Sequence, residues 1–367
     1  MPTKHVDKIL LSIVIILVIC GFLIFSSASL GLLAREGVSF SSVVFNQLFL
    51  GVFGGVAAML LMSQINYRHL RKYAFYIFFA TCLLTLAVFI PGIGYEHGGA
   101  QRWLSIFGFS LQPAEVLKVG FIIYVATWLS GVSKHITSFK QVTFPFIGIM
   151  GIVGIILLLQ PDTDTFLLIA TAGVAMFVTA GGRWRDVAVM FSIAALLLIV
   201  LAFTRPYILD RFTTFLDPSA DPQGSGYQIQ QSLIAIGSGG LTGRGYGQSI
   251  QKFEYLPEPI GDSIFAVYAE EFGFLGGTLL IILLAFFTFR GYKIATHARD
   301  MFGMLLVVGF MTIIAVQSFL NIAAMLSVAP LMGLPLPFIS HGGTALMFTL
   351  VAVGIVLNVS RYQKRII

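Results

Sequence analysis

Charged side chains are scarce in this chain of 367 residues. Asp, Glu, Lys and Arg together make up 10% of the sequence, whereas water-soluble domains contain about 25%. Hydrophobic residues account for 57%. A soluble globule needs more charged surface than these residues can supply. The composition therefore excludes that class and indicates an integral membrane protein.

Cysteine is almost absent as well. Cys20 and Cys82 are the two cysteines, and both lie inside apolar runs, which excludes a framework of disulfide bonds. The sequence also lacks the ligand spacing of zinc sites, paired cysteines and the strand-turn-helix motif of serine hydrolases. These absences argue against zinc chemistry and against a serine nucleophile.

Long apolar runs are what the sequence has in abundance. A helix needs about 20 residues to cross a hydrocarbon core of roughly 30 Å. Ten runs qualify, at residues 9–31, 43–63, 73–91, 113–131, 144–160, 165–181, 187–204, 272–290, 302–323 and 341–359. The first run could be a signal peptide, but it is longer than an ordinary signal core, which favours an uncleaved helix. We expect an all-α integral membrane protein whose residues 1–367 form a single polytopic domain.

The distribution of Lys and Arg predicts the orientation of this domain. Placing both termini in the cytoplasm puts most of the 22 basic residues on the cytoplasmic side, as membrane proteins prefer, and most of the 16 acidic residues on or near the outer side. The net charge of +6 is therefore a topology signal, and we expect no nucleic-acid partner. The predicted location is the bacterial cytoplasmic membrane.

One loop is much longer than the others. Residues 205–271 form a polar external region between the seventh and eighth runs, and loops of this length are functional or disordered. Apolar residues at helical spacing predict two short amphipathic helices on the membrane surface, within 208–216 and 229–236. Residues 237–247 are rich in glycine. They resemble a phosphate loop only weakly, because no strand precedes them, and a flexible turn close to a lipid-linked substrate fits better.

Acidic residues concentrate at the end of this loop. Five of the 16 carboxylates fall within residues 254–271. They are Glu254, Glu258, Asp262, Glu270 and Glu271. We interpret this stretch as the active site of the protein.

Charged residues also occur near the predicted outer ends of other runs. Glu115 and Lys118 stand three apart and therefore on one helical face. Inserting a charge at the centre of a membrane helix costs about 2.5–3.5 kcal/mol, so charges in such segments need a reason. The two residues form either an internal ion pair or the wall of a polar cavity that receives a charged head group. Arg102 is either an interfacial anchor or, with Lys118, a ligand for pyrophosphate.

Two further segments carry polar residues or helix breakers. Residues 160–164 place Asp162 and Asp164 in a short external turn, where acids are either solvated or functional. Residues 333–344 are rich in Pro and Gly. Irregular backbone at membrane depth needs protein or a water-filled cavity around it, which predicts a re-entrant segment that lines the same external cleft. We expect His341 in this segment to be structural.

Four motifs along the chain resemble those of a known family. They are Gln112-Pro-Ala-Glu-Val-Leu-Lys118, Tyr255-Leu-Pro-Glu-Pro-Ile-Gly-Asp-Ser-Ile-Phe-Ala-Val267, Gly333-Leu-Pro-Leu-Pro-Phe-Ile-Ser-His-Gly-Gly-Thr344 and Gly354-Ile-Val-Leu-Asn-Val-Ser-Arg361. They resemble the SEDS proteins (shape, elongation, division and sporulation), and the FtsW-like division branch more than the RodA-like elongation branch. The resemblance covers nearly the whole chain. The chain departs from the family in having Ile-Gly-Asp-Ser where His-Thr-Asp-Phe is commoner, and Ser-His-Gly-Gly where Ser-Tyr-Gly-Gly is usual.

The resemblance implies peptidoglycan glycosyl transfer. Proteins of this family polymerise lipid II, the lipid-linked disaccharide precursor, at the outer face of the membrane. The implied partners are a class B penicillin-binding protein and other divisome membrane proteins. The essential aspartate of the family matches Asp262, its glutamate near the start of the same motif matches Glu254, and its loop arginine matches Arg102. Its fourth-span glutamate and lysine match Glu115 and Lys118.

These residues suit the chemistry of that reaction. A sugar hydroxyl attacks the anomeric carbon of a donor that carries undecaprenyl diphosphate, so one carboxylate must accept a proton. Asp262 is the candidate base, because partial desolvation before the eighth run would raise its pKa. Cations must neutralise the departing diphosphate. We expect Arg102, Lys118 and Arg244 in this role, with Lys252 and Glu254 completing the substrate-binding set.

A divalent cation would also suit this chemistry. We expect Mg²⁺ or Mn²⁺ held by carboxylates, because hard cations favour oxygen ligands and phosphate. No organic cofactor is expected.

Two other classes of function compete with this one. A flippase for the lipid-linked precursor would also need charges inside a helical bundle, but it should have polar groups along a route to the cytoplasmic face. The acids of this chain cluster externally. A scaffold that only holds division proteins would leave the charged cleft without an explanation.

Overall fold

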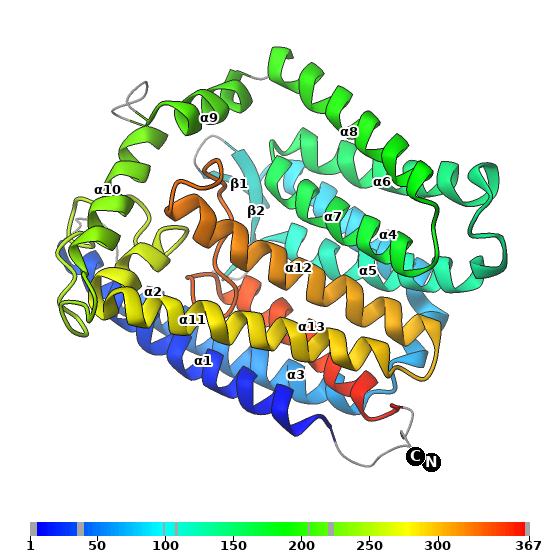
Figure 1. Ribbon diagram of the computed structural model, residues 1–367, viewed down its shortest axis with the longest axis horizontal. Coiled ribbons are helices and arrows are strands. Elements are labelled where there is room, and N and C mark those ends of the chain that lie inside the picture. Colours follow the sequence, from blue (N-terminus) through cyan, green and yellow to red (C-terminus); the bar gives the residue numbers. More distant parts are fainter. Residues whose placement is uncertain are drawn as a thin grey trace.

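The structure is a computed structural model that describes residues 6–34, 40–97, 100–106, 109–204, 206–218 and 224–363. Its helices run roughly along one long axis (Figure 1). The start of α1 and the end of α13 lie side by side, since Asp7 N donates to Ser360 Oγ at 2.9 Å. The helices of the bundle are α1 (Lys8–Ser29), α2 (Phe40–Asn46), α3 (Gly55–Gln64), α4 (Arg68–Leu86), α5 (Pro113–Gly131), α6 (Phe144–Leu159), α7 (Thr163–Thr179), α8 (Trp184–Thr204), α11 (Ile264–Thr296), α12 (Met301–Met325) and α13 (Gly343–Ser360).

The predicted all-α membrane class is confirmed. Within the described residues, nine helical segments are long and apolar enough to cross a membrane. They are Lys8–Leu33, Val43–Gln64, Arg68–Phe89, Pro113–Gly131, Phe139–Leu159, Trp184–Thr204, Ile264–Thr296, Met301–Met325 and Gly343–Ser360. The remaining predicted run, 165–181, falls on α7, which is apolar but has 17 residues. Each predicted run therefore overlaps a helix.

Helix α12 forms the centre of the bundle. It packs against α5, α7, α11 and α13. Within its most apolar stretch of 18 residues, 78% is buried inside the protein. Close helix contact depends on small residues. A Cβ atom at Gly309 would lie 2.7 Å from the sulfur of Met176 and 2.8 Å from Ile122. Helix α8 is much more exposed, because only 11% of its most apolar 18-residue stretch is buried. An apolar groove of about 610 Å³ separates it from α7, α11 and α12.

Local signals explain where several helices begin. The Asp7 carboxylate accepts a hydrogen bond from Leu10 N at the start of α1. Asp162 and Asp300 cap α7 and α12 in the same way. A side-chain oxygen at this position satisfies a backbone N–H that the helix leaves unpaired. Pro113 opens α5, where its missing N–H has no cost.

The eighth predicted run begins earlier than expected. Helix α11 starts at Ile264 and contains a kink at Gly273, with φ 66° and ψ −166°. The predicted apolar run starts only at residue 272, directly after Glu270 and Glu271. Both carboxylates have partners in the structure, described below, and burial within protein makes their position tolerable.

The polar segments outside the bundle include both predicted amphipathic helices, α9 (Pro206–Leu216) and α10 (Ser225–Ser238). The structure adds a small antiparallel sheet that the sequence did not predict. Its strands are β1 (Gly94–His97), β2 (Ala100–Ile106) and β3 (Phe109–Leu111), in the order β1-β2-β3. Tyr95 pairs with Trp103, and Leu104 pairs with Leu111.

The chain after α12 returns into the protein as irregular backbone, as the Pro and Gly content of 333–344 predicted. Leu336, Phe338 and Ile339 are each at most 2% exposed. A Cβ atom at Gly21 of α1 would lie 2.2 Å from the Phe338 carbonyl oxygen, so the segment packs directly on that helix. We call residues 326–342 the buried return segment, after residues 334–340, most of which are buried. It carries one wall of the site described next.

Candidate active site

Asp262 lies on the last turn of chain before α11, and three hydrogen bonds fix the backbone around it. The Asn321 side-chain amide donates to the Asp262 carbonyl oxygen at 2.8 Å. Ser340 Oγ donates to the Gly261 carbonyl oxygen at 2.7 Å, and His341 N donates to that of Ile260 at 2.7 Å. The candidate base is therefore held by α12 and by the buried return segment. The contact of His341 is made by its backbone, and the structural role expected of its side chain stays a prediction.

The Asp262 carboxylate faces Gly333 of the buried return segment. A Cβ atom added at Gly333 would lie 3.6 Å from Asp262 Oδ2 and 3.8 Å from Asp164 Oδ2. Two carboxylates from different elements thus flank one glycine. The absence of a side chain at Gly333 leaves the space between them open.

The pKa of the Asp262 carboxyl is raised from its ordinary 3.8 to about 7, chiefly by burial. The negative charges of Glu258 and Asp164 contribute to the rise, and the positive charges of Arg211 and Arg102 oppose it. A carboxylate whose pKa lies near neutral pH is ionised enough to accept a proton and basic enough to hold it.

Asp164 lies in the first turn of α7 and is paired with Arg211 of α9. Arg211 Nη1 lies 2.7 and 2.8 Å from the two oxygens of Asp164. Gly333 N also donates to Asp164 Oδ2 at 3.1 Å. The acid that a sequence reading could treat as solvated is only 4% exposed. It joins α7, the external loop and the buried return segment.

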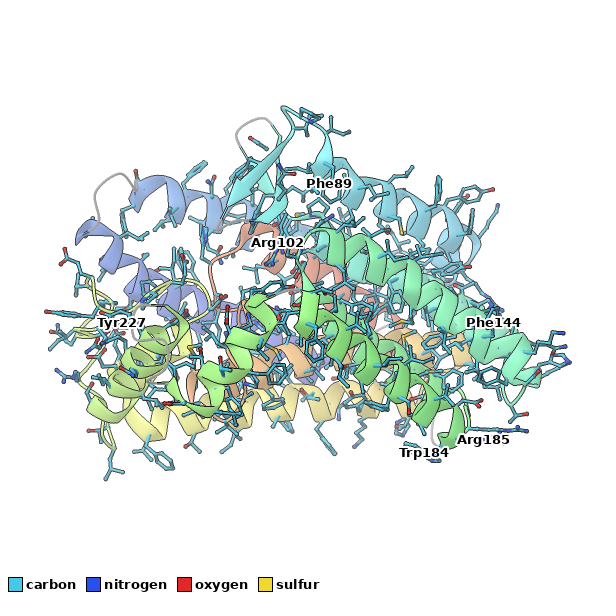
Figure 2. The ribbon with its side chains drawn as sticks, turned by 90° about the horizontal axis from the view of Figure 1, so that it is seen from above. Phe89, Arg102, Phe144, Trp184, Arg185 and Tyr227 are labelled. Atoms are coloured by element: carbon cyan, nitrogen blue, oxygen red, sulfur yellow. The ribbon has the colours of Figure 1, made fainter. Side chains whose placement is uncertain are left out.

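Arg102 reaches the site from strand β2, where the sheet meets the helical bundle (Figure 2). Its guanidinium donates to the carbonyl oxygens of Gln160 and Pro161, in the turn between α6 and α7. Burial raises the pKa of the neighbouring Asp162, and the positive charge of Arg102 opposes that shift. Asp162 Oδ1 accepts from Thr165 N at 3.3 Å, while Oδ2 has no partner among the described residues.

Glu115 and Lys118 form the internal ion pair that was one of the two alternatives. Their charged atoms are 2.7 Å apart, and both side chains are buried in α5. Lys118 Nζ also donates to Gln317 Oε1 at 3.1 Å, and the Gln317 amide donates to the Pro335 carbonyl oxygen at 2.8 Å. The pair is therefore joined, through α12, to the segment that flanks Asp262.

Lys252 has a different environment from the one expected. It is 0% exposed, and its ammonium group contacts Glu271 at 2.8 Å, the Gly247 carbonyl oxygen at 2.9 Å and Ser27 Oγ at 3.2 Å. An ammonium group enclosed in this way has no surface for a substrate. Ser27 belongs to α1, so Lys252 links the external loop to the first helix.

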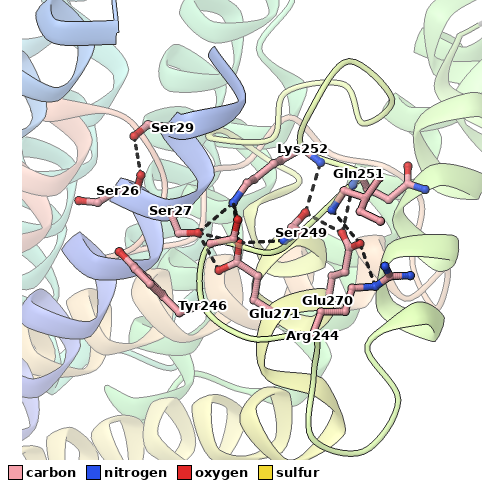
Figure 3. Close-up of polar contacts among 12 residues, drawn as sticks. Ser26, Ser27, Ser29, Arg244, Tyr246, Ser249, Gln251, Lys252, Glu270 and Glu271 are labelled. Carbon is pink, nitrogen blue, oxygen red and sulfur yellow. Dashed lines mark hydrogen bonds and ion pairs between the residues drawn. The ribbon is translucent and has the colours of Figure 1, made fainter. Parts of the chain in front are cut away.

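Arg244 and Glu254 also lie outside the immediate surroundings of Asp262. Arg244 Nε pairs with Glu270 at 3.4 Å, and Glu270 accepts from Ser249 Oγ at 2.6 Å. Glu254 is exposed, with φ 70°. Figure 3 shows Arg244 and Lys252 converging on the two adjacent glutamates. We call this group the loop anchor; its members are Ser27, Arg244, Ser249, Lys252, Glu270 and Glu271.

The glycine-rich segment 237–247 also has a structural explanation. Cβ atoms at Gly239 and Gly243 would lie 2.2 Å from Ala269 O and 2.1 Å from Glu271 O. Arg244 N and Gly245 N donate to the carbonyl oxygens of Glu270 and Glu271. The glycines therefore allow the loop to pack on the kinked start of α11. The predicted close approach to a lipid-linked substrate stays a prediction.

Arg211, Gln317 and Asn321 were not singled out from the sequence. Gln317 and Asn321 are four residues apart, so they share one face of α12. A pair of amides at this spacing in an otherwise apolar run was a signal that could have been used. Arg211 carried no such signal, because an arginine on an amphipathic surface helix is ordinarily solvated.

Comparisons with known proteins agree with this architecture. A family model for FtsW, RodA and SpoVE, described as cell cycle protein, matches residues 7–365. Stage V sporulation protein E of Bacillus subtilis (strain 168) is 37% identical over 367 residues, which cover 99% of this chain and 100% of the relative. A probable peptidoglycan glycosyltransferase FtsW of Geobacter metallireducens is 38% identical over 310 residues, which cover 84% of this chain and 83% of the relative.

A solved structure gives the same result. It describes how a peptidoglycan synthase complex coordinates polymerization and crosslinking, and one of its chains matches with a TM-score of 0.80 and 26% identity. The match covers 98% of this chain and 99% of that one. Together with the whole-length family match, this shows that the chain belongs to the FtsW/RodA/SpoVE family of multi-pass bacterial membrane proteins.

Proposed function

We propose that this protein is a peptidoglycan glycosyltransferase that polymerises lipid II during cell division. The observation that carries the proposal is the environment of Asp262, a carboxylate with a pKa of about 7 that lies near two arginines. The names of the relatives support the same activity, and the solved complex is a peptidoglycan synthase.

In the proposed reaction, Asp262 accepts the proton of the acceptor sugar hydroxyl as its oxygen bonds to the anomeric carbon of the donor. The bond between that carbon and the diphosphate oxygen breaks, and undecaprenyl diphosphate leaves with both bonding electrons. The leaving diphosphate needs no proton. A single base therefore suffices, unlike the two carboxylates of glycoside hydrolysis. Arg102 supplies positive charge near the departing group.

The expected Mg²⁺ or Mn²⁺ stays a prediction. Within the described residues, no group of three or more His, Cys, Asp or Glu side chains could hold a metal ion. Asp164 and Asp262 flank Gly333, but Arg211 already neutralises Asp164. These residues do not fit a resident metal site, so no step of the proposed reaction runs through one.

The proposed orientation places Asp262 toward the outer leaflet and both termini in the cytoplasm. The opposite end of the bundle carries most of the basic residues and two ion pairs, Arg68 with Asp300 and Arg290 with Asp7, at 3.0 and 2.7 Å. This distribution supports the orientation. A class B penicillin-binding protein is the proposed partner, since the matching complex couples polymerization to crosslinking. Other divisome membrane proteins are further proposed partners.

The proposal is tested with purified protein, its partner and lipid II. We expect Asp262→Ala to abolish polymer formation, measured as the amount of glycan strand produced. The control is Asp210→Asn, which alters an exposed acid of the same external loop. Polymerisation by Asp262→Ala at the parental rate would contradict the proposal. Transfer of lipid II between leaflets of a vesicle without polymer formation would favour the flippase alternative instead.

A further inference from the structure

We propose that Arg211 binds the diphosphate of the lipid-linked donor, and that Asp164 holds Arg211 beside Asp262 while the donor is absent. This inference rests on the proposed function, because it assigns a substrate-binding residue to the same site. Donor binding would transfer Arg211 from a carboxylate to a phosphate, and both are anions that a guanidinium recognises in the same planar geometry.

The geometry of the ion pair leaves Arg211 available. Its Nη1 atom contacts both oxygens of Asp164, at 2.7 and 2.8 Å. Nε and Nη2 make no hydrogen bond to any residue that the structure describes. The Arg211 side chain is 29% exposed, whereas that of Asp164 is 6% exposed. The carboxylate is thus committed to its partner, and the guanidinium has donors left for a ligand.

Arg211 and Arg102 reach Asp262 from separate elements. Arg102 lies on β2 and Arg211 on α9. Arg211 is paired with Asp164. The carboxylates of Asp164 and Asp262 flank the same position at Gly333, at 3.8 and 3.6 Å from a Cβ atom placed there. Arg102 is bonded to the turn that leads into α7, the helix that carries Asp164. A diphosphate presents two adjacent anionic groups. Two converging arginines can neutralise one group each, whereas a monophosphate can use only one of them fully.

The position of α9 fits a lipid head group. Its apolar residues Leu209, Phe212 and Leu216 are 53%, 49% and 81% exposed. An amphipathic helix with exposed apolar residues lies in the membrane interface, which is also the depth of a lipid diphosphate. Helix α9 contacts α8 and α10, its neighbours in the chain. The Arg211–Asp164 pair adds a link to α7 that a substrate could exchange.

A purely structural ion pair makes a different prediction from a binding residue. If the pair only fastened α9 to α7, removing either partner would break the same link and have the same consequence. If Arg211 binds diphosphate, removing Arg211 weakens binding. Removing Asp164 frees Arg211 from a competing anion, so binding is retained or becomes tighter. The two single variants therefore distinguish the two roles.

The test measures inhibition of polymerisation by undecaprenyl diphosphate and by undecaprenyl monophosphate, with the full chain in complex with its partner. For Arg211→Gln we expect the inhibition constant of the diphosphate to rise about tenfold, as loss of one charge-assisted contact predicts, and that of the monophosphate to change less. For Asp164→Asn we expect no rise. Arg68→Gln breaks a more exposed ion pair far from the site, with Asp300, and serves as the control for the loss of an arginine.

Equal weakening by Arg211→Gln and Asp164→Asn would overturn the inference and leave the proposed function intact. Full activity of Asp262→Ala would instead overturn the proposed function itself. Thermal unfolding of each variant shows whether it is folded. If Arg211→Gln does not fold, Arg211→Lys replaces it, because lysine keeps the charge and loses the planar pair of donors. Unchanged diphosphate inhibition of Arg211→Lys would then contradict the proposal.

Discussion

The Asp262 site and the loop anchor draw their acids from the same short stretch of sequence, but their environments differ. In the loop anchor, Glu270 and Glu271 are buried, and each is paired with a cation and further hydrogen-bond donors. At the site, Asp262 is partly exposed and makes no side-chain hydrogen bond to the described residues. Saturated charges hold structure, whereas an unsatisfied carboxylate with a raised pKa is available for chemistry.

Replacing one acid from each region gives the largest expected effect and the sharpest test of this difference. We expect Asp262→Asn to lower the polymerisation rate by about 10²–10⁴-fold, the usual contribution of a general base. Its thermal stability at pH 8 should not fall, because burial already disfavours the ionised form. Asp210→Asn is the control. If the midpoint of thermal unfolding of Asp262→Asn also fell clearly below that of the parent, the loss of activity would reflect a structural role of Asp262.

The loop anchor should respond in the opposite way. Lys252→Met removes a cation that is 0% exposed and leaves Glu271 buried without it. Breaking a buried pair in this manner costs about 3–5 kcal/mol, which we expect to see as a lower midpoint of thermal unfolding. Arg244→Gln removes a cation that is 38% exposed. This substitution should lower the free energy of unfolding by about 1 kcal/mol or less. Similar losses for the two variants would contradict the distinction.

The pH dependence of activity should report the Asp262 carboxyl. Its pKa is raised to about 7, so the ionised base is lost as the pH falls below that value. We expect the polymerisation rate to drop about tenfold per pH unit below the pKa of Asp262 and to level off above it. The folded-state pKa lies above the unfolded one. This group therefore disfavours the folded state increasingly as the pH rises from about 4 to 7. A polymerisation rate that does not change between about pH 5 and pH 8 would contradict the assignment.

Gly333→Ala should have the smallest effect. The added methyl group would lie 3.6 Å from Asp262 Oδ2 and 3.8 Å from Asp164 Oδ2, which is ordinary contact distance. It would displace solvent from between the carboxylates and raise the Asp262 pKa, since burial disfavours the charged form. We expect the limb of the pH profile to move up by about half a unit. A shift to lower pH would show that Gly333 does not control the hydration of Asp262.

Much of the fold could be read from the order of the residues. Apolar runs predicted each helix of the bundle, because crossing a hydrocarbon layer requires that length and composition. The amphipathic pattern predicted α9 and α10, and Pro and Gly predicted the irregular backbone of the buried return segment. The small sheet escaped prediction, since its strands are short and gain stability from pairing rather than from composition.

The members of the site were harder to predict. Glu115 and Lys118 were found together because a helix places residues three apart on one face. Arg211 and Asp164 are separated by 47 positions, and nothing in either local sequence points to the other. Lys252 looked available for a substrate until its neighbours on α1 and α11 were known. Local patterns do not report such pairings.

The sequence by itself determined the membrane class, the helices and the acidic stretch with Asp262, because each depends on composition or on spacing along one element. The tertiary structure decided which charges are satisfied. That depends on distances between elements far apart in the chain, and these distances set both desolvation and Coulomb interactions. Among acids of one stretch, packing made Glu270 and Glu271 structural and left Asp262 with a pKa of about 7.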